Sequence, residues 1–134
     1  MSAKDIVKTF YSQNLASEDQ AMNLIHPDVE LNWHSSKGYK SLNYNDIDDK
    51  LREIRRSYET WRFKISHLLE EKEEVTIRYT IYATSIERPN KEQPLAHFIT
   101  IWQVKEGKLY KGFEISQLAD DSSGSLSSFT EIKV

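Results

Sequence analysis

The sequence has no cysteine and no excess of basic side chains among its 134 residues. The lack of cysteine excludes disulfide bonds, thiolate nucleophiles and cysteine metal sites. A net charge of -3 gives no general basic field, so nucleic acid is not an expected partner. No run approaches the eighteen or so apolar residues of a membrane span, and Met1 to Lys8 lacks the apolar segment of a secretory signal. We therefore expect a cytoplasmic protein that contacts no membrane.

Several chemistry-bearing motifs are also missing. The chain has no Gly-x-Ser-x-Gly elbow, no phosphate-binding loop and no Gly-x-Gly-x-x-Gly segment, so acyl-enzyme chemistry and nucleotide binding have no support. The four histidines show none of the close pairings of common metal sites. We therefore expect no metal and no cofactor, and any catalysis would be general acid/base chemistry on a bound organic molecule.

The order of the patterns predicts the fold class. Helical periodicity dominates up to Tyr58, and alternating strand patterns dominate from Trp61 to Leu118. Such segregation favours an α+β domain in which three N-terminal helices pack on one face of a curved, mainly antiparallel sheet. The length allows one core, so we expect a single domain over 1–119 and, from its serine-rich composition, a flexible C-terminal tail over 120–134.

Three helices are expected before the long strands. The first begins after Ser2 with a capping box. A short second helix begins near Ser17 and ends at His26, because the residue before a proline avoids the α region. The third begins at Asn45 and continues to Tyr58, with apolar residues at helical spacing.

The strands are predicted from alternation. Val29 to His34 alternates with Trp33 on the core face, and Ser35 to Asn43 is expected to be a loop. Lys105 to Gly107 is expected to form a tight hairpin turn. The four remaining strands are expected at Trp61 to Leu69, Val75 to Ile86, Leu95 to Val104 and Leu109 to Leu118.

Three segments carry a family resemblance. They are Ile6-Val7-Lys8-Thr9-Phe10-Tyr11, His26-Pro27-Asp28-Val29-Glu30-Leu31-Asn32-Trp33-His34 and Trp102-Gln103-Val104-Lys105-Glu106-Gly107-Lys108-Leu109. With these segments the chain resembles the nuclear transport factor 2-like superfamily and, within it, the SnoaL-like branch. The resemblance implies a cone-shaped α+β barrel with a deep pocket and a homodimer formed through the outer sheet face. The functions of this superfamily are mixed, so the reaction stays open.

The resemblance names one candidate catalytic residue. SnoaL-like polyketide cyclases carry an acid/base carboxylate on the final strand, and the nearest position here is Glu114. A carboxyl inside an apolar cone would have a raised pKa and could move a proton near neutrality. The neighbouring strand has Thr100 where a cyclase histidine is usual. The ketosteroid isomerase pattern finds a match only in Tyr11, so that reaction is not supported.

The remaining candidates are residues for a small apolar or amphipathic organic ligand. Strand parity groups Phe98 with Thr100 and Trp102, and the resemblance places this set inside the cone. Aromatic side chains also make candidates of Tyr11, Trp33, Tyr39 and Tyr82, and His34 is expected at the pocket mouth.

Three functions therefore remain open from the sequence. The first is a small-molecule-binding protein whose catalytic activity is undecided. The second is an isomerase, dehydratase or polyketide cyclase in which Glu114 moves a proton. The third is a noncatalytic module that associates through an outer sheet face carrying His97, Ile99 and Ile101.

Overall fold

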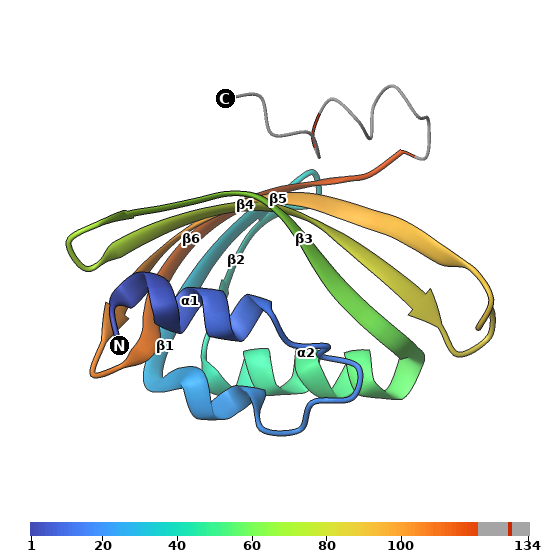
Figure 1. Cartoon of the computed structure of the whole chain (residues 1–134), viewed down its shortest axis with the longest axis horizontal. Helices are drawn as coiled ribbons and strands as arrows, with labels where there is room; N and C mark the ends of the chain where they lie inside the picture. Colours follow the sequence, from blue (N-terminus) through green and yellow to red (C-terminus); the bar gives the residue numbers. More distant parts are fainter. Residues whose placement is uncertain (121–128, 130–134) are drawn as a thin grey trace.

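The computed structural model describes residues 1–120 and residue 129. Within them, a curved six-stranded sheet arches over two α-helices (Figure 1). The elements are α1 (Ala3–Tyr11), the 3-10 helix η1 (Ala21–Leu24), β1 (Ile25–Ser35), β2 (Gly38–Leu42), α2 (Tyr44–Ser57), β3 (Tyr58–Glu71), β4 (Glu74–Ser85), β5 (Glu92–Lys105) and β6 (Lys108–Leu118).

The strand order of the sheet is β2-β1-β6-β5-β4-β3. All neighbouring strands are antiparallel except β1 and β6, which are parallel. The α+β class and the mainly antiparallel sheet are thus as predicted. Because the sheet curves, its concave face surrounds the helices and its convex face is turned away from them (Figure 1).

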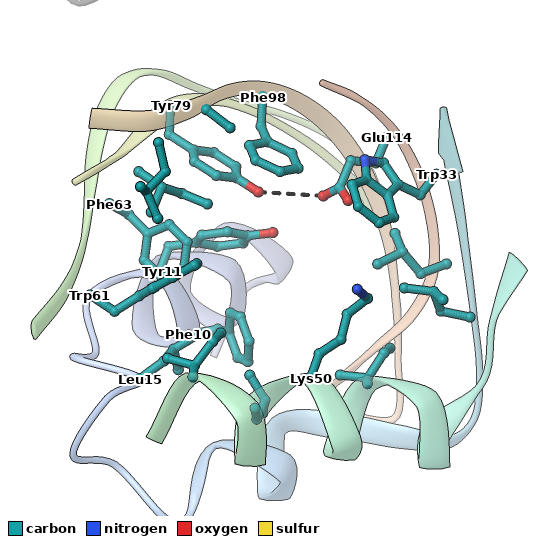
Figure 2. A pocket seen from close by; sticks show the side chains of 18 of the residues that line it. Phe10, Tyr11, Leu15, Trp33, Lys50, Trp61, Phe63, Tyr79, Phe98 and Glu114 are labelled. Atoms are coloured by element: carbon teal, nitrogen blue, oxygen red, sulfur yellow. Dashed lines mark hydrogen bonds between the residues drawn. The ribbon is translucent and has the colours of Figure 1, made fainter. Parts of the chain in front are cut away.

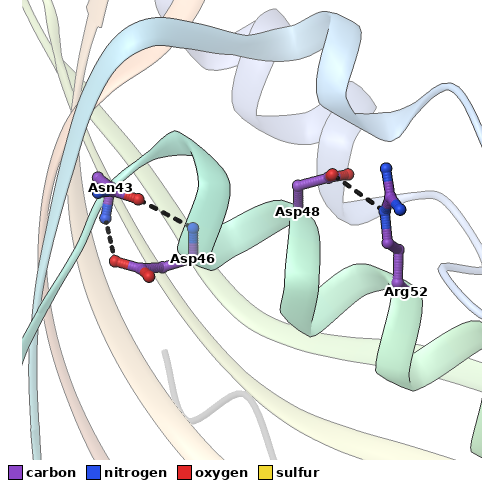
Figure 3. A network of polar contacts seen from close by, with 4 residues as sticks. All are labelled: Asn43, Asp46, Asp48 and Arg52. Atoms are coloured by element: carbon purple, nitrogen blue, oxygen red, sulfur yellow. Dashed lines mark hydrogen bonds and ion pairs between the residues drawn. The ribbon is translucent and has the colours of Figure 1, made fainter.

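Both α-helices begin with a capping box. In α1 the Ser2 hydroxyl accepts a hydrogen bond from the backbone N–H of Asp5, as predicted. In α2 the Asn43 side chain and Asp46 satisfy each other's backbone N–H groups, and Asp48 pairs with Arg52 one turn later at 3.1 Å (Figure 3). The helix begins at Tyr44, one residue before the predicted start at Asn45, and its capping residue is Asn43.

The expectation of three helices is wrong among the described residues. The second helix is reduced to the four-residue 3-10 helix η1, and β1 begins directly after it at Ile25. His26 lies within this strand, because the extended conformation that a residue adopts before proline suits a strand as well as a helix end. Four residues are also too few for the backbone hydrogen-bond pattern of a stable α-helix.

The expected loop from Ser35 to Asn43 instead contains a strand. Gly38 has a φ of 107°, which L side chains rarely adopt, and it opens β2 as the second arm of a hairpin with β1. Only Leu42 of β2 is buried, so this edge strand has no alternating apolar pattern that the sequence could show.

The convex face contacts one residue beyond Asp120. The Phe129 ring lies 4.4 Å from the His97 ring and 3.7 Å from the Arg78 guanidinium. The rest of the predicted flexible tail lies outside the described residues. Within the described part of the chain, no helix is long and apolar enough to cross a membrane.

Candidate functional site

A cavity of about 420 Å³ lies between the concave face of the sheet and the two helices (Figure 2). Its lining is mostly apolar, with side chains from both helices and from every strand of the sheet. The volume is within the usual range for sites that hold small organic molecules. The lining includes Phe10, Leu15, Leu31, Leu42, Ile47, Leu51, Ile54, Trp61, Ile81, Leu95 and Leu118.

One wall of the cavity is a continuous series of aromatic rings. Tyr79 stacks on Phe98 with ring centroids 5.2 Å apart and planes at 6°. Phe98 in turn stacks with Trp33 at 6.5 Å, and Tyr79 contacts Phe63 and Tyr11 at 5.2 and 4.9 Å. These contacts hold the rings in fixed orientations, so the wall presents a preformed aromatic surface to a ligand.

Glu114 is a buried carboxyl that faces this cavity (Figure 2). It lies in the middle of β6, opposite Thr100 of β5 and Trp33 of β1. The Thr100 hydroxyl donates a hydrogen bond of 2.8 Å to Oε1, and the Tyr79 hydroxyl donates a longer one of 3.4 Å to the same oxygen. Both donors hold Oε1, so Oε2 is the oxygen that a bound molecule could reach.

Burial sets the acidity of this carboxyl. Removal from water raises the pKa of Glu114 to about 7, against the opposing effects of the two hydroxyl donors and of the Lys50 charge. Near neutral pH the carboxyl therefore exists in both protonation states in comparable amounts.

Two buried tyrosines complete the polar part of the cavity. Burial, followed by the charge of Glu114, raises the pKa of Tyr11 well above its usual range, and burial also raises the pKa of Tyr79. Both phenols therefore stay neutral and can donate hydrogen bonds. The Trp102 indole N–H donates to the Tyr11 oxygen at 2.9 Å, which leaves the Tyr11 proton for another acceptor.

The cavity contains Tyr11, Trp33, Phe98, Trp102 and Glu114 from the predicted set. Thr100 is fully buried and holds Glu114 rather than lining the cavity itself. The Trp33 indole N–H donates to the Ser116 hydroxyl at 2.8 Å, which fixes the ring beside the carboxyl. The structure therefore brings six predicted side chains together.

Three predicted residues lie elsewhere, and their expected placement at the pocket is corrected. His34 follows Trp33 on β1, so alternation turns it to the convex side, where its ring is 4.9 Å from Tyr39. The Tyr39 hydroxyl donates to Asn32 at 2.7 Å instead of entering the cone. Tyr82 lies under the Arg62 guanidinium at 4.8 Å and does not line the cavity.

Tyr79 and Lys50 are among the cavity residues that were not predicted. Tyr79 lies at an alternate position of β4 between the buried Ile77 and Ile81, so the three side chains share one face of the strand. This alternation could be seen in the sequence. Lys50 extends from α2 toward Glu114 and Trp33, with Nζ 4.9 Å from the centroid of the Trp33 ring (Figure 2). Among the described residues, no group of three or more histidine, aspartate and glutamate side chains is placed to hold a metal ion.

Comparisons with solved structures support the fold. IdmH of Streptomyces antibioticus, a candidate polyketide cyclase, superposes with a TM-score of 0.66 at 14% identity over 95% of this chain and 97% of that one. A candidate SnoaL-like polyketide cyclase of Shewanella denitrificans gives 0.64 at 11% identity over 95% of both chains. TerC, co-crystallised with polyporic acid, gives 0.56 at 18% identity over 96% and 98%. At these identities the likeness shows the fold alone.

The family rests on the sequence. A comparison with curated proteins finds no matching sequence. The family model described as the SnoaL-like domain, in contrast, matches residues 5–111. This match runs from α1 into the first residues of β6, and so reaches every strand of the sheet. The resemblance drawn from the three segments is thereby confirmed, and the chain belongs to the SnoaL-like branch of the nuclear transport factor 2-like superfamily.

Proposed function

We propose that the cavity binds a mainly apolar organic molecule with a carbonyl group, and that Glu114 moves a proton to or from the carbon beside that carbonyl. The observation that carries this proposal is the arrangement of the carboxyl. Oε1 is held by Thr100 and Tyr79, while Oε2 has no hydrogen-bond partner among the described residues. A fixed carboxyl with one free oxygen in a largely apolar cavity is suited to proton transfer.

The acidity of Glu114 fits this reaction. With a pKa of about 7, the carboxylate form can accept a proton from carbon, and the acid form can return it. The proton leaves the carbon, the electron pair moves to the carbonyl oxygen as an enolate, and reprotonation completes the cycle. The neutral Tyr11 hydroxyl is the nearby donor that would stabilise the enolate oxygen.

The structural neighbours support the ligand class but not a particular reaction. Two are candidate polyketide cyclases, and a third was crystallised with polyporic acid, an organic acid. Carbonyl-rich organic molecules are therefore the first class to test.

Hydrogen–deuterium exchange tests the proposal directly. 2-Tetralone has an apolar body and exchangeable protons beside its carbonyl, and its proton NMR signal in D₂O reports their loss. We expect the wild-type protein to accelerate this loss, and Glu114→Gln to reduce the acceleration by a factor on the order of 10² to 10⁴. Glu30→Gln, which changes an exposed glutamate of β1, is the matched control. Equal acceleration by wild type and Glu114→Gln would exclude Glu114 as the group that moves the proton, and no acceleration by the wild type would restrict the cavity to binding.

A second proposal concerns assembly. Ile99, Ile101, Phe113 and Ile115, here called the convex cluster, form two cross-strand pairs on β5 and β6 and are 38 to 61% exposed. Adjacent exposed apolar side chains of this kind mark an association surface. We propose that a second copy of the chain covers the convex cluster. Sedimentation at micromolar concentration tests this, and a monomer would overturn it.

A further inference from the structure

Lys50 is an exposed residue that lines the cavity and places a positive charge at the edge of this mostly apolar space. It belongs to α2, and its side chain extends into the space below Glu114 and Trp33 (Figure 2). Its Nζ lies 4.9 Å from the centroid of the Trp33 ring. The ring face attracts the ammonium, which holds the cation at the end of the aromatic wall.

The surrounding residues balance this charge only in part, through the ionised fraction of Glu114. Three residues with ordinarily charged side chains line the cavity: Lys50, Glu53 and Glu114. The Glu53 carboxylate is engaged by Arg56 at 3.0 Å and by the Ser57 hydroxyl at 3.2 Å. Among the described residues Lys50 forms no ion pair within 4.0 Å, and burial keeps part of the Glu114 population neutral at pH 7 through its raised pKa.

We propose that the cavity selects an aromatic organic anion, with Lys50 binding the anionic group and the wall of Trp33, Phe98 and Tyr79 binding the ring system. This inference rests on the proposed function in that it assigns a substrate class to the same cavity. A cation beside an apolar cavity gains most from a ligand that brings the opposite charge, since water is displaced when the ligand binds.

The position of Lys50 also orients the ligand. Lys50 and Glu114 both lie next to Trp33, from α2 and from β6 respectively. An anionic group bound by Lys50 therefore lies at the same end of the cavity as the carboxyl that exchanges protons. The reacting carbon is then close to the ligand's anionic group, as in an aromatic acid or an ionised enol, and not at the far end of the ring system.

A pair of fluorescent probes tests the charge preference. 8-Anilinonaphthalene-1-sulfonate and N-phenyl-1-naphthylamine share their ring system and differ by the sulfonate. We expect the wild-type protein to bind the anionic probe about tenfold more tightly than the neutral one, and Lys50→Met to remove that preference while changing the affinity for the neutral probe less than about twofold. Lys50→Arg should retain the preference. Lys64→Met, which removes an exposed lysine of β3, should leave both affinities unchanged.

The isoleucines locate the bound probes. Methyl signals of Ile47, Ile54 and Ile81 report on the cavity, whereas those of Ile99 and Ile115 report on the convex face. Shifts of the first group support the inference. It would be overturned by equal binding of the two probes to the wild type, by equal losses for both in Lys50→Met, or by shifts confined to the second group. None of these results depends on proton exchange, so a failure of the tetralone test with an intact anion preference would overturn only the proposed proton transfer.

Discussion

On β5 and β6, side chains that face the cavity alternate with side chains that face the opposite side of the sheet. Thr100 and Glu114 are cross-strand partners on the concave face, and both are polar. The neighbouring partners on the convex face, Ile99 with Ile115 and Ile101 with Phe113, are apolar and partly exposed. The two strands thus place their polar pair inside the protein and their apolar pairs toward solvent.

This inversion costs stability on both faces of an isolated chain. A carboxyl withdrawn from water is unfavourable, and apolar side chains left in water contribute no burial. Polar side chains ordinarily face water and apolar ones the core, and function is expected where positions depart from this rule without a gain in stability. The concave face is therefore the place to look for chemistry, and the convex face the place to look for a partner.

The two faces should differ most in the free energy of unfolding that is lost when an aromatic side chain is removed. Trp102 is buried and donates to Tyr11, so Trp102→Ala should lower the free energy of unfolding by about 3 to 5 kcal/mol. Phe113 follows Gly112, the β6 partner of Trp102, and is 49% exposed in the single chain. Phe113→Ala should therefore cost the monomer less than about 1 kcal/mol. Urea unfolding followed by circular dichroism measures both. Similar losses for the two variants would contradict the division into faces.

The pH dependence of stability tests the concave face alone. The folded state binds the Glu114 proton more tightly than the unfolded state, whose carboxyl has the ordinary glutamate pKa of 4.5, against about 7 in the folded protein. Between these two values unfolding releases a proton. Raising the pH through this window therefore destabilises the wild type, by about 3 kcal/mol in total. Glu114→Gln cannot ionise and should lack this loss.

Urea midpoints at pH 4.5 and pH 8.5 measure that effect. At the lower pH the carboxyl is mostly protonated in the folded wild type, and the two proteins should be similarly stable. At the higher pH Glu114→Gln should be the more stable by about 2 to 3 kcal/mol. A constant difference across the range would mean that the Glu114 carboxyl is solvated.

The sheet could be predicted from the sequence because its strands alternate. The four long strands were expected within a few residues of their observed bounds, and parity correctly grouped Phe98 with Trp102 and separated both from Ile99. Parity alone does not say which group is inside. That choice came from the family resemblance, because an exposed isoleucine and a buried threonine reverse the usual order.

The missed elements lack the patterns on which such predictions depend. β2 buries only Leu42, so it does not repeat often enough to show a period. The short second helix was predicted in the right place but too long, because η1 is a single turn of 3-10 helix. Lys50 was missed for a different reason. It has the helical spacing of Ile47 and Ile54, but a lysine on a helix is ordinarily solvated, and Lys50 is itself an exposed residue. Only the arrangement of α2 over the cavity shows that its side chain lines that space.

The smallest effect on stability should come from the convex face, and there the measurable change is in assembly. Ile115 is 61% exposed in the single chain, so Ile115→Lys should alter the free energy of unfolding of the monomer by no more than about 0.5 kcal/mol. If a second copy covers the convex cluster, the new charge would be buried against apolar surface in the dimer, and the variant should sediment as a monomer at micromolar concentration. Leu69→Lys is the matched control, because Leu69 is 60% exposed but lies near the β3–β4 hairpin, outside the cluster. A dimer that survives Ile115→Lys but dissociates in Leu69→Lys would show that the interface lies near the β3–β4 hairpin. The convex cluster would then not be the dimer interface.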